Sequence, residues 1–143
     1  MKNMIFGTYE HSIDKKKRMF LPAKVREYMG ENIIMVKSLS GKCIALYPEA
    51  EWEKFEEKLE ALPKVTASDV FRKVYSSLSI AQTDANGRIL IPQNLCEYAE
   101  LEKNVVVIGV GSHAEIWSDE NRKLQCEKEN SPDLLDTLRE IGL

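Results

Sequence analysis

The sequence carries one pattern twice, at an offset of seventy residues. When residues 14–28 are aligned with residues 84–98, five of the fifteen positions are identical, whereas average composition would give about one identity. The identical pairs are Asp14/Asp84, Arg18/Arg88, Pro22/Pro92, Glu27/Glu97 and Tyr28/Tyr98. The correspondence resumes between residues 32–36 and 104–108. This repeat predicts two copies of one supersecondary unit.

Each copy is predicted to contain a charged turn, a short strand, a short helix and a β-hairpin. The Asp-x-x-x-Arg segment is expected to be a turn between strands, because Asp, Asn and Gly at 84–87 favour tight turns. The strand after each arginine ends at a proline that suits the first turn of a helix, expected at 23–28 and 93–98. The hairpin strands are expected at 33–37 with 44–47, and at 105–110 with 114–117.

Strands this short rarely enclose a core by themselves. We therefore expect the two copies to pack about a pseudo-two-fold axis, so that each buries the apolar strands of the other. The predicted fold class is α+β, a tandem-repeat β-barrel with peripheral α-helices. The two charged turns would then project outward from related positions.

Two helices are predicted between the copies. Trp52, Phe55 and Leu59 lie at helical spacing with glutamates on the opposite face, and Pro63 ends this helix. Residues 66–69 are similar to a capping box, which predicts a second helix that begins there.

The C-terminal region is predicted to be a linker followed by a helix. Residues 121–130 are polar and are expected to be mobile, whereas Ser131-Pro132 begins a last helix that Gly142 ends. The expected organisation is a first repeat at 5–51, connecting helices at 52–76, a second repeat at 77–120, and the linker with its helix at 121–143.

Charge is distributed unevenly along the chain. The net charge of −3 argues against a protein that coats nucleic acid uniformly. Residues 11–26 contain six Lys or Arg and one acid, whereas residues 49–60 contain six Glu and two Lys. Basic and acidic roles therefore belong to different segments.

The sequence offers little for catalysis or for a cofactor. The three cysteines (Cys43, Cys96, Cys126) and two histidines (His11, His113) are isolated and lack metal-ligand spacing. No P-loop, nucleophile elbow or dinucleotide fingerprint is present. We expect no enzyme activity, no cofactor or metal, and no small-molecule substrate.

Membrane association is not expected either. No apolar run approaches the roughly 18 residues that a membrane helix needs, and residues 1–7 are too short in apolar residues for a secretory signal. The expected location is the cytoplasm.

The motifs together resemble the MraZ family of SpoVT/AbrB-type, swapped-hairpin bacterial transcription factors. The segments that carry the resemblance are both Asp-x-x-x-Arg turns, "LYPEAEWEKFEEKLEALP" and "DANGRILIPQNLCEYAELEKNVVVIGVGSHAEIW", between Ile5 and Trp117. The resemblance implies a swapped-hairpin, double-psi-like barrel. It also implies sequence-specific binding to double-stranded operator repeats of a cell-division and cell-wall operon, nucleoid association and a ring-shaped homo-oligomer.

The resemblance places the DNA contacts on the two turns: Asp14 with Arg18, and Asp84 with Arg88. Arginine on a turn between strands can bind guanine in the major groove. The aspartate four residues earlier can accept hydrogen bonds from the turn amides or orient the guanidinium.

The run Lys15, Lys16 and Lys17 is expected to neutralise phosphates. The family usually has Gly where this chain has Lys17, as it does at Gly87. If the backbone there is left-handed, lysine costs about 1 kcal/mol or more relative to glycine. We expect the strain to be tolerated for the additional charge.

Two alternatives to DNA binding are compatible with the sequence. The chain could be a non-catalytic adaptor that binds proteins through the acidic helix at 49–60, and an enzyme is a weaker third reading. The second turn has little positive charge around it, since residues 84–103 contain two cations and four acids. A ring that presents many first-copy turns would compensate by effective concentration.

Overall fold

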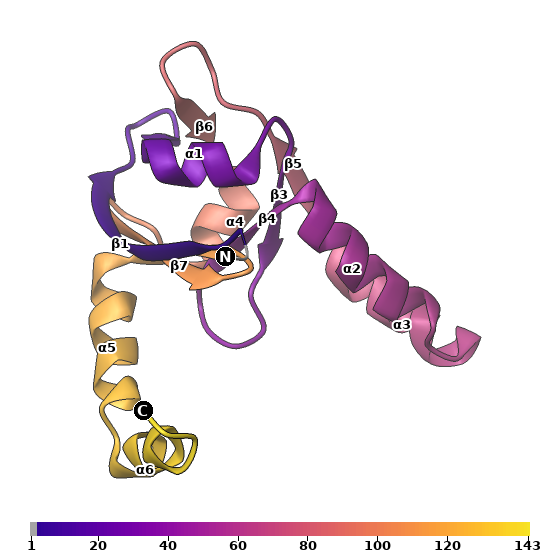
Figure 1. The fold of residues 1–143 in the computed structure, drawn as a ribbon. Coiled ribbons are helices and arrows are strands. Elements are labelled where there is room, and N and C mark those ends of the chain that lie inside the picture. The colour runs from indigo at the N-terminus through magenta and orange to yellow at the C-terminus, as the bar shows by residue number, and fades with distance from the viewer. Residues whose placement is uncertain (1–2) are drawn as a thin grey trace.

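The computed structural model describes residues 3–143. Figure 1 shows strands and short helices gathered in one body, from which two helical extensions project. In chain order the elements are β1 (Ile5–Ser12), β2 (Arg18–Phe20), α1 (Ala23–Met29), β3 (Ile33–Lys37), β4 (Ile44–Pro48), α2 (Glu49–Glu60), α3 (Lys64–Tyr75), β5 (Ser79–Ala81), β6 (Arg88–Leu90), α4 (Gln93–Tyr98), β7 (Asn104–Gly111), β8 (Ala114–Ser118), α5 (Asp119–Glu129) and α6 (Pro132–Glu140).

The strands form two antiparallel sheets, so the α+β class is confirmed. A six-stranded sheet has the order β1-β7-β8-β4-β3-β5, and β2 pairs with β6 in a separate two-stranded ribbon. The strands and short helices predicted within each repeat are all present, with ends that differ by one residue at most.

The two copies exchange strands. In the first copy β1 pairs with β7 and β2 pairs with β6, while in the second copy β5 pairs with β3. The central pairs are Met19 with Ile89 and Ala45 with Glu115, each joining positions seventy residues apart. A pseudo-two-fold axis therefore passes between equivalent residues of the copies, as the repeat predicts.

A closed barrel is not found in the strand pairing of residues 3–143. The six-stranded sheet has free edges at β1 and β5, and β2 and β6 hydrogen-bond to each other. The ribbon strands have only three residues each, and outside the ribbon the pairing of β2 is limited to one isolated bridge, between Met19 and Ile13.

Apolar strand residues from both copies share one core. Met19, Ile89 and Leu21 are almost completely buried in it. Because side chains alternate across a strand, the residues on either side of Met19 and Ile89 face outward. The core thus determines which side chains the ribbon presents to solvent.

The helices α2 and α3 form an arm that leads away from the sheets (Figure 1). At its base Trp52 packs with Ile34 and Val36, but α3 has no buried residue. The predicted capping box is wrong: α3 begins at Lys64, after Pro63, and its first residue has no side-chain cap. Proline fixes φ near the helical value, −56° at Pro63, so the helix can begin at Lys64, two residues before Thr66.

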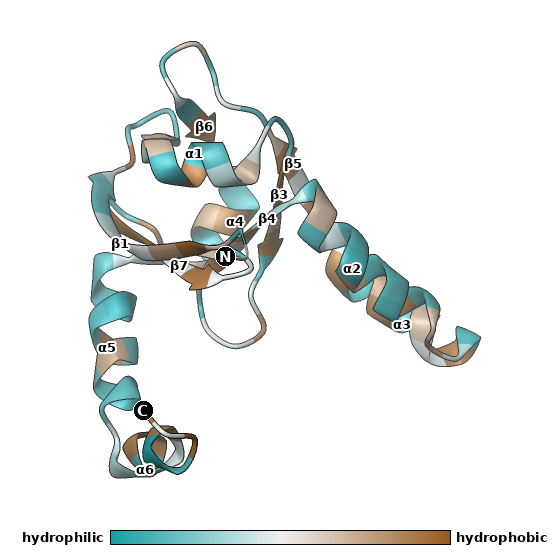
Figure 2. Ribbon diagram, in the orientation of Figure 1, coloured by the Kyte–Doolittle hydropathy of each residue, from teal (hydrophilic) through white to brown (hydrophobic). Residues whose placement is uncertain are grey.

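The segment expected to be a mobile linker is helix α5. The Ser118 side chain accepts a hydrogen bond from the Asn121 amide at 3.1 Å, and Arg122 pairs with Glu129 at 2.8 Å. Capping and polar pairs therefore form a helix without an apolar stripe, which Figure 2 shows as mostly hydrophilic. The last helix, α6, begins after the Ser131 cap, as predicted. No helix among residues 3–143 is both long and apolar enough to cross a membrane.

Candidate nucleic-acid interface

In the first turn, Asp14 uses both carboxylate oxygens. Its Oδ1 accepts hydrogen bonds from the amides of Lys16 at 2.8 Å and Arg18 at 2.9 Å. Its Oδ2 accepts from Arg18 Nε at 3.2 Å. The aspartate thus shapes the turn and orients the guanidinium at the same time.

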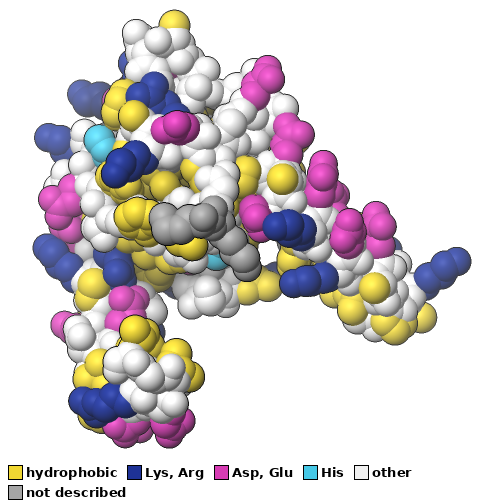
Figure 3. All heavy atoms as spheres, viewed as in Figure 1, with side chains coloured by type: hydrophobic (Ala, Val, Ile, Leu, Met, Phe, Trp, Pro, Cys, Tyr) yellow, Lys and Arg dark blue, Asp and Glu magenta, His cyan; other side chains and the backbone are white. Residues whose placement is uncertain are grey.

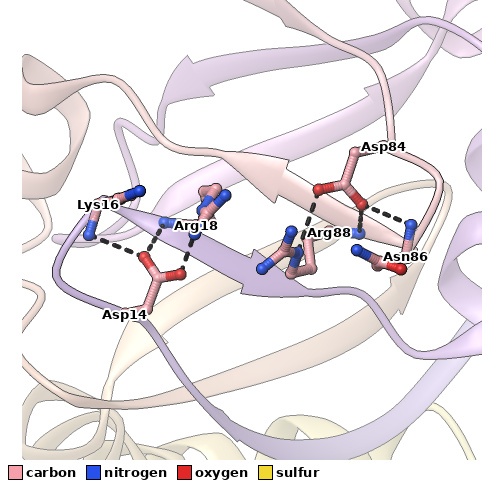
Figure 4. Close-up of polar contacts among 6 residues, drawn as sticks. All are labelled: Asp14, Lys16, Arg18, Asp84, Asn86 and Arg88. Carbon is pink, nitrogen blue, oxygen red and sulfur yellow. Dashed lines mark hydrogen bonds and ion pairs between the residues drawn. The ribbon is translucent and has the colours of Figure 1, made fainter.

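The second turn repeats this geometry (Figure 4). Asp84 Oδ1 accepts from the amides of Asn86 at 2.8 Å and Arg88 at 2.9 Å, and its Oδ2 accepts from Arg88 Nε at 3.1 Å. The seventy-residue repeat is therefore a repeat of individual hydrogen bonds as well as of residue types.

Both arginines remain at the surface. The side chains of Arg18 and Arg88 are 33% and 31% exposed, and their hydrogen bonds within residues 3–143 use Nε alone. Each guanidinium therefore has its Nη donors left for a ligand. Exposed ion pairs of this kind contribute about 0–1 kcal/mol to stability, so a structural role alone does not explain their duplication.

The aspartates are held in the charged form. The backbone amide of Arg18 lowers the pKa of Asp14, and burial opposes that effect in part. The amide of Arg88 acts on the pKa of Asp84 in the same way. Both carboxylates therefore stay ionised at neutral pH and keep the arginines oriented.

Lys17 has a left-handed backbone with φ of 64°, close to the 77° of Gly87. Its amide donates to Asp14 O at 3.0 Å, as the Gly87 amide does to Asp84 O. The two turns have the same shape, and the left-handed backbone considered for Lys17 is confirmed.

The predicted phosphate-binding lysines lie on the first turn. Lys15 and Lys16 are exposed, and Lys17 is half-buried. The second turn has Ala85, Asn86 and Gly87 at the equivalent positions. The positive charge of the turn residues is therefore concentrated in the first copy.

The outer face of the ribbon also carries two exposed apolar side chains that were not among the residues predicted for the site. Arg18 lies opposite Leu90, and Phe20 lies opposite Arg88. Phe20 is 40% exposed and Leu90 is 59% exposed. The alternation of the Arg-φ-φ-φ-Pro strand was the signal for them, because the residue two positions after the arginine lies on the same face of the strand as the arginine.

A third arginine, Arg26 of α1, lies at the same face. Its guanidinium carbon is 5.0 Å from the centre of the Phe20 ring, a cation–π contact. In the sequence, Arg26 stands out only as part of the positive charge of residues 11–26. Its position depends on packing between the copies, which no local pattern indicates.

Comparison with known proteins finds relatives over most of the chain. The profile of the MraZ protein family, which is described as antitoxin-like, matches residues 4–72 and 79–136. A protein of Heliobacterium modesticaldum named transcriptional regulator MraZ is 45% identical over 127 residues, which cover 87% of this chain and 88% of that protein.

Two further relatives with the same name extend the match. One from Pelotomaculum thermopropionicum is 46% identical over 117 residues, 80% of each chain. One from Clostridium botulinum is 42% identical over 143 residues, covering 98% of this chain and 100% of that protein. Profile and relatives agree over most of the sequence, so the chain belongs to the MraZ family.

Proposed function

We propose that this protein is a sequence-specific DNA-binding transcriptional regulator that acts on its own cell-division and cell-wall operon. The observation that carries the proposal is the duplicated turn, in which an aspartate orients a surface arginine on each strand of one β-ribbon. The name of the relatives, transcriptional regulator, supports the same role. The regulator would associate with the nucleoid.

Arg18 and Arg88 are the base-reading residues of this proposal. A two-stranded β-ribbon fits the major groove, and a guanidinium there can bind guanine O6 and N7 at once. The aspartates already restrict the guanidiniums, so binding loses less side-chain entropy. Exposed apolar neighbours such as Leu90 suit the methyl group of thymine.

Lys15, Lys16 and Lys17 would contact the phosphate backbone. Each neutralised phosphate releases counterions, so the affinity would fall steeply as salt increases. These contacts fix the register of the ribbon on DNA but do not distinguish sequences.

A homo-oligomeric ring would supply affinity that one ribbon lacks. Closure of a ring requires two different surfaces on each subunit. Exposed apolar residues on the helical extensions, including Val65 of α3 and Ile141 after α6, offer such surfaces. Figure 3 shows hydrophobic side chains at the ends of both extensions. Many turns on one ring would then bind repeated operator sites together.

Fluorescence anisotropy with direct-repeat DNA from the protein's own upstream region tests this function. Arg18→Ala should abolish operator binding, and circular dichroism should show the fold unchanged. A matched control is Arg72→Ala on α3, because Arg72 is also an exposed arginine paired with an aspartate. Equal binding by Arg18→Ala and the wild type would refute the proposal, and recovery of a protein partner through α2 would then favour an adaptor.

A further inference from the structure

Within residues 3–143, Arg26 is a cation without an acidic partner. No carboxylate among residues 3–143 lies within 4.0 Å of it, and its Nε is buried with no hydrogen-bond partner in that part of the chain. Its guanidinium lies over the face of Phe20, which is on the outer side of the ribbon. A guanidinium has five N–H donors. Arg26 is therefore positioned by Phe20 while it keeps N–H donors for a ligand.

The guanidinium reaches the turn of the other copy. A Cβ atom added to Gly87 would lie 2.6 Å from Arg26 Nη1, so the end of the Arg26 side chain would have to move to make room for it. Gly87 therefore leaves space that Arg26 fills. Although Arg26 belongs to the first copy, its charge lies beside the second turn.

At the equivalent place of the first turn, a lysine stands where the second turn has a glycine, and a small residue stands where it has the arginine. At an offset of seventy residues, Gly87 corresponds to Lys17 and Arg26 corresponds to Cys96. Cys96 is small and buried. Burial raises the pKa of its thiol, and the nearby charge of Lys17 partly opposes that change.

Each turn therefore has one cation at this place, supplied from a different position. In the first turn the cation is Lys17 of the turn itself, near the small Cys96. In the second turn it is Arg26, on the helix of the other copy, beside Gly87. The low charge of the second turn's own sequence is thus partly compensated by packing between copies.

We propose that Arg26 contacts a DNA phosphate beside the second turn and replaces there the charge that Lys17 provides at the first. This inference rests on the proposed DNA-binding function. Guanidinium and phosphate form strong charge-assisted hydrogen bonds. Phe20 limits the motion of the guanidinium, and the neighbouring Arg88 reads the bases while Arg26 holds the backbone.

A salt series with Arg26→Gln tests the assignment. Because a phosphate contact is lost, the slope of log affinity against log salt should become shallower by about 0.9 for each engaged second turn. Operator and shuffled DNA should weaken by the same factor. Arg26→Lys, which keeps the charge, should retain most of the slope. Thermal unfolding of both variants separates this effect from a loss of fold.

A transplant of the first-turn arrangement gives a second test. Arg26→Cys should show the shallower slope, and Gly87→Lys added to Arg26→Cys should restore it. The inference is overturned if wild type and Arg26→Gln have the same slope, or if the double variant stays at the value of Arg26→Cys. If Arg26→Gln kept the wild-type slope while Arg18→Ala did not bind operator DNA, the inference would fail and the proposed function would stand. Failure of the wild type to bind would remove both.

Discussion

Met19 and Ile89 pair at the centre of the β2–β6 ribbon, seventy residues apart in sequence, and both are buried in the shared core. This pairing forces the flanking arginines onto the opposite face. The packing of the core therefore determines that two guanidiniums from distant segments lie on one surface. Loss of either side chain would change the presentation of both turns.

Asp14→Asn should reduce discrimination between operator and shuffled DNA. The asparagine oxygen can still accept from the turn amides, but its NH₂ group cannot accept from Arg18 Nε. The guanidinium becomes less oriented while the local charge becomes more positive. We expect the ratio of the two affinities to fall severalfold and binding to shuffled DNA to increase. Asp69→Asn on α3, which removes a similar pair, should change neither value.

Asp84→Asn should be less stable than the wild type at neutral pH, by an amount that disappears in acid. The folded-state pKa of Asp84 is lowered from 3.8, with the Arg88 amide as the largest cause. A lowered pKa gives stability above the unfolded value, and that stability is lost as pH falls through the folded value. Urea unfolding at a series of pH values measures this. A difference that stays constant from pH 7 to acid would contradict the role of the charge.

The repeat made the turns predictable, because a motif that occurs twice identifies its own equivalent positions. The left-handed backbone at Lys17 follows from its alignment with Gly87. Two features were beyond this reasoning. Helix α5 has no apolar stripe, so its capping was the only signal. The location of Arg26 depends on how the copies pack, and its counterpart Cys96 gives no indication of a shared role.

Lys17→Gly should make the protein more stable and its DNA binding less sensitive to salt. Relief of a left-handed non-glycine residue is worth about 1–2 kcal/mol, and the backbone entropy of glycine offsets about 0.5–1 kcal/mol of it. The free energy of unfolding should therefore rise by roughly 0.5–1 kcal/mol. Gly87→Ala is the matched opposite, because its φ of 77° and the nearby Arg26 both disfavour a Cβ. A less stable Lys17→Gly protein would show that the side chain contributes more than its strain.

Leu90→Ala should weaken binding only where the operator presents a thymine methyl group to it. Leu90 is 59% exposed and lies directly opposite Arg18, so a ribbon in the major groove would bring it next to the base that Arg18 reads. Uracil lacks the methyl group of thymine and leaves the hydrogen bonds of the base pair unchanged. Each thymine of the operator can therefore be replaced in turn by uracil, with wild type and Leu90→Ala measured on every DNA. At the contacted position the wild type should lose affinity severalfold, while Leu90→Ala should bind both DNAs equally. If Leu90→Ala lost the same affinity on thymine and uracil at all positions, the leucine would act on the fold or on assembly and would not read the base.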